Sequence, residues 1–206
     1  MTAESPVADS EGLIALEEAD ARIVGGKGAS LQWLAANGYR VPRTWVVPPD
    51  AAIQVGAVDE NMRYAVRSSA NVEDGDRASF AGQFETVLDV NGASAIEEAI
   101  ETVRASATSA SVESYTHEMH TDTAIEMSVL VQEMVEPVVS GVVFTRNPIT
   151  GLNELILEAV EGSGEQLVQG GVTPQRWVRL WGAWIAEPDR PILADDLATA
   201  VADEAL

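Results

Sequence analysis

The chain's only lysine, Lys27, lies in the glycine-rich segment Gly25-Gly26-Lys27-Gly28. Small residues let a phosphate come close to backbone N–H groups, and a nearby ammonium group supplies the countercharge. The spacing differs from a Walker A loop, and a Gly-Gly-Lys-Gly segment taken alone is an ordinary turn. Its meaning therefore depends on the residues that accompany it.

A second group of candidate residues follows forty positions later. Arg67 precedes Ser68 and Ser69, and Gly82 and Thr86 come after them. Arginine presents a planar fork of donors to phosphate oxygens, serine hydroxyls add donors, and Gly82 allows close backbone approach. An arginine at a strand end often pairs with a carboxylate, but the combination with the lysine segment predicts a nucleotide triphosphate site.

Candidates for binding the adenine base follow an apolar strand at Gln132 and Met134. A segment between two lobes commonly contacts adenine through its backbone, and methionine supplies an apolar slot. The alternative reading is a plain strand end. We assign no catalytic residue and no metal ligand from the sequence.

Regular apolar spacing predicts the elements that position these residues. Helices are expected at 26–36, where Asn37-Gly38 ends the first one, at 94–115 and within 193–206. Strands are expected at 44–47, 63–66 (ending at Arg67), 85–90, 127–131, 141–144, 155–159 and 177–181. We expect the strands 141–144 and 155–159 to form an antiparallel hairpin, and 68–81 to be a long functional loop.

The composition narrows the class of protein. With 206 residues and 46% hydrophobic content, the chain can bury a substantial core. A net charge of −21 argues against a nucleic-acid partner, so an anionic nucleotide needs locally placed cations and Mg²⁺. The chain has no cysteine and no apolar stretch of membrane-spanning length. We therefore expect a cytoplasmic protein without a membrane partner.

Six motifs in this order resemble the N-terminal nucleotide-binding domain of the phosphoenolpyruvate synthase and pyruvate phosphate dikinase family, which the rifampin phosphotransferases share. The resemblance covers roughly residues 12–182. The motifs are Val24-Gly25-Gly26-Lys27-Gly28-Ala29-Ser30-Leu31, Ala65-Val66-Arg67-Ser68-Ser69, Glu73-Asp74 with Ser79-Phe80-Ala81-Gly82, Val131-Gln132-Glu133-Met134-Val135, Gly141-Val142-Val143-Phe144-Thr145-Arg146-Asn147-Pro148 and Gly162-Ser163-Gly164-Glu165.

The resemblance implies an α+β, ATP-grasp-like fold that holds ATP between two lobes, with Mg²⁺ on the phosphates. Lys27 and Arg67 would then contact phosphates, Gly82 and Thr86 would line the pocket, and Gln132 would lie beside the adenine. In this family of kinases the ATP-derived phosphate passes to a histidine on a separate domain, and from there to pyruvate or another acceptor.

Three departures from the family pattern shape the expected domain organisation. The segment between Pro49 and Arg63 is short, no metal-binding Glu with a Gln-x-Arg clamp precedes Leu206, and the phosphohistidine and acceptor domains are absent. We expect a flexible arm at 1–11, the nucleotide-binding domain at 12–182 with a shortened first lobe and a truncated second lobe, and an incomplete segment at 183–206.

Two functional readings remain open at this point, beside that of a truncated remnant. The chain is either the ATP-binding part of a dikinase-like phosphotransferase, incomplete alone and completed by a phosphohistidine domain on another chain, or a non-catalytic module that binds a nucleotide or a partner.

Overall fold

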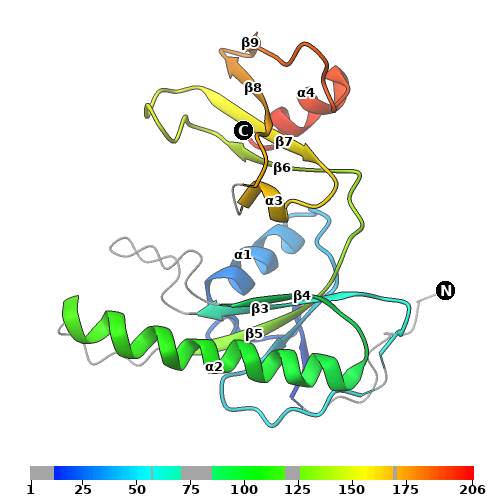
Figure 1. Cartoon of the computed structure of the whole chain (residues 1–206), viewed down its shortest axis with the longest axis vertical. Coiled ribbons are helices and arrows are strands. Elements are labelled where there is room, and N and C mark those ends of the chain that lie inside the picture. Colours follow the sequence, from blue (N-terminus) through cyan, green and yellow to red (C-terminus); the bar gives the residue numbers. More distant parts are fainter. Residues whose placement is uncertain (1–11, 57, 71–84, 119–125, 169–170) are drawn as a thin grey trace. The chain divides into compact units, whose positions relative to one another are not determined.

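The computed structural model describes residues 12–56, 58–70, 85–118, 126–168 and 171–206, with the side chains of 107–118, 166 and 168 left aside. The chain forms two compact units, residues 1–134 and 135–206 (Figure 1). Each unit contains an antiparallel sheet and at least one helix, so the mixture of helices and strands expected of an α+β fold is confirmed.

The sheet of the first unit has the strand order β1-β2-β5-β3-β4 and antiparallel pairing throughout. Its elements are β1 (Ile14–Ala15), α1 (Gly25–Ala36), β2 (Thr44–Val47), β3 (Tyr64–Ala70), β4 (Thr86–Val90), α2 (Ala93–Glu118) and β5 (Met127–Glu133).

Helices cover both faces of this sheet, which explains why its central strand is buried from Met127 to Gln132. Alternate side chains of β5 point to opposite faces, so Val129 and Val131 meet α2 while Leu130 lies on the α1 side. Figure 1 shows α1 and α2 on opposite sides of the sheet. The α2 face is the larger core, because Ile96, Ile100 and the strand residues beneath them are fully buried.

Helix α1 ends where the sequence predicts. The Gly38 N–H donates to the carbonyl of Ala35, and the Tyr39 N–H donates to that of Leu34, both at 3.1 Å. This is the bonding pattern of a Schellman motif, which needs a left-handed residue after the helix. Gly38 supplies it with a φ of +86°.

The second unit has a sheet in the order β6-β7-β8-β9 with antiparallel pairing. Helix α4 packs on the face of this sheet that contains Leu157 and Trp177, and its buried residues Ala198 and Ala202 allow a close approach. The elements are β6 (Val139–Phe144), β7 (Leu155–Glu161), α3 (Glu165–Val168), β8 (Gln175–Leu180), β9 (Ala183–Ala186) and α4 (Asp195–Glu204).

The predicted hairpin is confirmed, since β6 and β7 pair in continuous antiparallel register from Val139–Glu161 to Phe144–Ile156. One prediction is wrong in its boundary: β3 does not end at Arg67 but continues to Ala70. Residues 68–70 pair with β5 and are buried, so they belong to the sheet and not to the expected loop. The rest of that loop lies outside the described residues.

The domain boundaries stay predictions. The arm at 1–11 lies outside the described residues, and β9 and α4 belong to the same compact unit as β6, β7 and β8. Among the described helices, none has the length and apolar character that a bilayer crossing requires.

Candidate functional site

A buried serine fixes the N-terminus of α1 to the sheet. The Ser69 hydroxyl on β3 donates to the carbonyl of Val24 at 2.6 Å and accepts from the N–H of Gly28 at 3.0 Å. These two backbone groups are four residues apart and would otherwise form the first bond of the helix. The hydroxyl therefore holds the start of α1, with Lys27, against β3.

Two glycines of the lysine segment serve this close packing. Gly25 has a φ of +65°, and a Cβ placed there would lie 2.1 Å from the carbonyl oxygen of Ser69. A Cβ on Gly28 would lie 2.9 Å from the Cβ of Val24. The structure thus gives Gly25 a role in docking the helix on β3 and Gly28 a role in packing against Val24, beside any role in admitting a phosphate.

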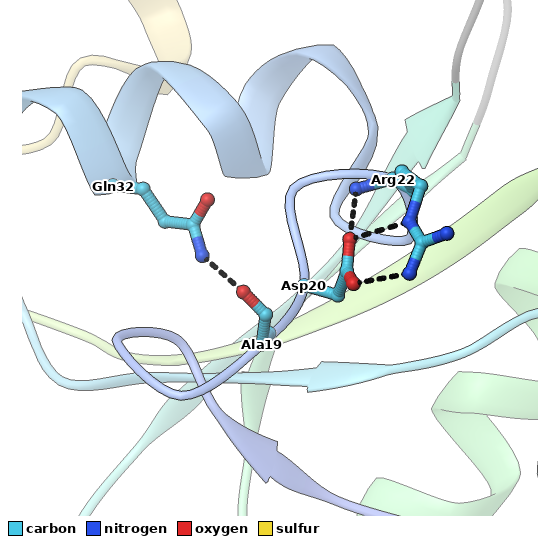
Figure 2. Close-up of polar contacts among 4 residues, drawn as sticks. All are labelled: Ala19, Asp20, Arg22 and Gln32. Carbon is cyan, nitrogen blue, oxygen red and sulfur yellow. Dashed lines mark hydrogen bonds and ion pairs between the residues drawn. The ribbon is translucent and has the colours of Figure 1, made fainter.

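The loop before α1 is ordered by its own polar contacts (Figure 2). The Asp20 carboxylate accepts from the backbone N–H of Arg22 at 2.8 Å and from its guanidinium at 2.7 and 3.0 Å. These hydrogen bonds hold the pKa of the Asp20 carboxyl well below its usual range. Gln32 on α1 donates to the carbonyl of Ala19 at 2.8 Å, which ties the helix back to this loop.

Arg67 and Thr86 are direct neighbours across the β3–β4 pair. Arg67 also lies opposite Leu130 of β5, so strand pairing places it on the α1 face of the sheet. Its Nε atom is buried and makes no hydrogen bond to any described residue. A buried guanidinium N–H without an acceptor is costly, so this position suits an anionic ligand.

Lys27 lies close to the same part of β3. Its Nζ is 3.5 Å from the hydroxyl of Ser68, the residue after Arg67. The structure therefore places Arg67 and Thr86 side by side on β3 and β4 and brings Lys27 of α1 to Ser68, the residue next to Arg67.

Gln132 lies on the same face as Arg67 and is its diagonal neighbour across the β3–β5 pair. Its side chain is 8% exposed, and its Nε2 donates to the hydroxyl of Thr44 on β2 at 2.9 Å. The Thr44 hydroxyl in turn donates to the carbonyl of Pro42 at 2.8 Å. The carbonyl end of the Gln132 amide has no partner among the described residues.

Met134 lies just beyond the end of β5. Its side chain extends toward β4, whereas that of Gln132 extends toward β2. Its N–H donates to the carbonyl of Arg63 at 2.8 Å, and its sulfur accepts from the N–H of Asp89 on β4 at 3.2 Å. Gln132 and Met134 thus have their partners on different flanks of β5. Gly82 lies outside the described residues.

Sequence reasoning missed Thr44 and the anchoring role of Ser69. Thr44 is 88 positions from its partner Gln132, so no local pattern links them. Ser69 carries no local signal either, because it follows another serine and its hydroxyl bonds to the carbonyl of Val24, 45 positions away. No group of three or more histidine or acidic side chains within the described ranges is placed to hold a metal.

Comparison with known proteins gives a family for this site. Residues 52–183, more than half of the chain, match the family model described as pyruvate phosphate dikinase, AMP/ATP-binding domain. The phosphoenolpyruvate synthase of Aeropyrum pernix is 47% identical over 122 residues, which are 58% of this chain and 15% of that protein. That of Pyrococcus furiosus is 42% identical over 127 residues, 61% of this chain and 16% of that protein.

A rifampicin phosphotransferase of Streptomyces sviceus is similar over a longer stretch. It is 37% identical over 183 residues, which are 84% of this chain and 20% of that protein. The chain thus spans about a fifth or less of the length of these relatives. It belongs to the family of the pyruvate phosphate dikinase AMP/ATP-binding domain.

Proposed function

We propose that the α1 face of the first sheet binds the phosphates of MgATP through Lys27 and Arg67, with an ATP-grasp-like arrangement of the nucleotide. The observation that supports this most strongly is the buried Arg67 Nε, which lacks an acceptor among the described residues. A phosphate oxygen would satisfy it with a charge-assisted hydrogen bond. Thr86, beside Arg67, and Gly82 would line the same pocket.

The adenine would lie toward Gln132 and Met134. The carbonyl oxygen of the Gln132 amide can accept from an exocyclic amine, while its Nε2 stays bonded to Thr44. The Met134 thioether supplies a polarisable apolar surface close to the same strand end. Two-sided contact of this kind, with one polar anchor and one apolar wall, is typical of nucleotide pockets.

Local cations are essential because the chain as a whole repels anions. The net charge is −21, so an ATP molecule approaches against an unfavourable field. Lys27 and Arg67 offset this field at short range, where Coulomb interactions are strongest. Removal of either cation should therefore leave the phosphates with less compensation for this unfavourable field.

The described residues do not form a cluster of metal ligands, so they do not by themselves fit a dedicated Mg²⁺ site. Mg²⁺ is commonly bound through substrate phosphates and water with only one or two carboxylates. We accordingly expect the ion to arrive with the nucleotide, and we derive no step that depends on its protein ligands.

We further propose that the chain is the ATP-binding module of a dikinase-like phosphotransferase, passing phosphate to a histidine on a separate domain or chain. The similarity to phosphoenolpyruvate synthases and a rifampicin phosphotransferase supports this, as does the much greater length of those relatives. In phosphoryl transfer, positioning and charge neutralisation supply most of the catalysis, and the residues assembled here can provide both.

A non-catalytic nucleotide-binding module is the second candidate. It is favoured by the roles proposed for these side chains. Lys27 and Arg67 would bind phosphates and Gln132 would bind adenine, and none of the three is proposed as a general acid or base. Labelled ATP, supplied with a histidine domain from one of the relatives, separates the two candidates. Transfer of label to that domain supports the enzyme, whereas binding without transfer supports the module.

The binding proposal is tested by calorimetric titration with MgATP. Lys27→Ala or Arg67→Ala should each weaken binding by about 1.5–3 kcal/mol, the range for hydrogen bonds to charged groups, which is roughly 10- to 150-fold. Arg40→Ala is the matched control, since Arg40 is an exposed cation outside the site. Equal affinity for MgATP in the wild type and both site variants would refute the proposed phosphate site.

A further inference from the structure

Strand β6 (Val139–Phe144) is the outer strand of the second sheet and lacks the usual protection of an edge. The sequence Val-Ser-Gly-Val-Val-Phe contains no charge and no proline, and its pairing with β7 has no bulge. Native proteins normally protect exposed edges with lysines, prolines or bulges, because free backbone groups invite another strand. An unprotected edge of six residues therefore points to a partner strand.

The backbone groups available for pairing can be identified from the register. The N–H of Gly162 donates to the carbonyl of Val138 at 2.8 Å. Hydrogen-bonded pairs alternate along an antiparallel ladder, so every second residue of β6 is turned away from β7. The N–H and C=O groups of Val139, Gly141 and Val143 consequently point outward, and no strand in the described part of the chain pairs with them.

The same three residues line an apolar groove. It has a volume of about 480 Å³ and runs between β6 and α4, where Leu197 is 50% exposed and Val201 contributes to the wall. All of its lining residues are apolar. A strand added to β6 would extend the floor of this groove and cover part of its apolar surface.

We propose that a second copy of this chain occupies the edge, with the two β6 strands pairing antiparallel about a twofold axis at Gly141. This register sets Val139 opposite Val143 of the other copy. The outward N–H and C=O groups of each strand then face those of the other along the whole strand. The two sheets then continue as one, with both grooves on the same side. The interface is self-complementary, as a twofold contact requires.

Charges at the two ends of β6 favour this register. Glu136 precedes the strand and Arg146 follows it, and both are exposed. Neither forms an ion pair with a described residue. In the proposed register Glu136 of each copy lies opposite Arg146 of the other, which gives two cross-pairs. The net charge of −21 opposes association at long range, so added salt should promote the dimer.

Sedimentation velocity on the full chain tests the proposal, at low and high ionic strength. The expected species has twice the 21.9 kDa mass of the chain and is more abundant in high salt. Glu136→Arg should weaken the dimer by about tenfold, because two attractive pairs become repulsive. This substitution also lowers the overall negative charge, so a non-specific charge effect would strengthen association instead.

The double variant with Glu136→Arg and Arg146→Glu restores opposite charges and should recover the dimer. Val143→Pro removes one outward N–H without touching the bonds to β7, so it should abolish the dimer while far-UV circular dichroism stays unchanged. Val143→Thr is the matched control and should remain dimeric. A monomer under all conditions, or a dimer indifferent to these changes, overturns the proposal.

Discussion

Removing the hydroxyl of Ser69 should loosen the start of α1. In Ser69→Ala the carbonyl of Val24 and the N–H of Gly28 both lose their bridging partner, and both residues are buried. An unsatisfied buried backbone group costs about 1–3 kcal/mol. The two groups can recover part of this by closing onto each other as the first helical bond, so the expected net loss is about 1–3 kcal/mol.

Urea unfolding followed by circular dichroism measures this loss, and hydrogen exchange of the α1 amides shows where it acts. Protection should fall in α1 and stay unchanged in the second unit. Ser30→Ala is the matched control, because Ser30 lies exposed on the same helix and its replacement should change stability by less than about 0.5 kcal/mol. If Ser69→Ala were as stable as the wild type, with α1 exchange unaltered, the anchoring role of the hydroxyl would be refuted.

Two further predictions concern stability. Gly25→Ala should destabilise the fold by more than Gly38→Ala, because both have positive φ but only the Cβ at position 25 would meet backbone, at 2.1 Å. The Gly38 change should cost about 1–2 kcal/mol, which is the cost of a left-handed backbone conformation for alanine without any clash. Equal midpoints of thermal unfolding for the two variants would contradict the reasoning. Burial, with a smaller contribution from the charge of Glu133, raises the pKa of the Tyr64 hydroxyl above its usual value. The unfolded chain therefore loses this proton first as pH rises past about 10, so stability should fall there, and less so in Tyr64→Phe.

Much of the fold follows from local pattern. The helix at 26–36 and its end at Asn37-Gly38 were predictable, because apolar spacing and a left-handed glycine are both visible in the sequence. The central strand β5 was equally clear from its apolar run at Val129, Leu130 and Val131. The two-residue strand β1 was not, because so short a segment becomes a strand only through its pairing with β2.

The site was less predictable, because its side chains depend on contacts far apart in the sequence. Ser68 and Ser69 suggest a loop by composition, yet β3 continues through both of them. Their polar groups are satisfied by partners more than forty positions away, so no local rule could place them in a strand. Likewise, the Gly25 position suggests phosphate binding, whereas the structure shows that a Cβ at this position would also clash with the backbone of β3.

The central claim is that MgATP binds on the α1 face of the first sheet, and mapping of backbone amide chemical shifts tests it most directly. Titration of the ¹⁵N-labelled chain with MgATP should produce the largest changes at Lys27, Arg67 and Thr86, with smaller ones at Gln132 and Met134. The same titration of Arg67→Ala should show little change. Shifts confined to β8, β9 and α4, or none with saturating nucleotide, would contradict the account.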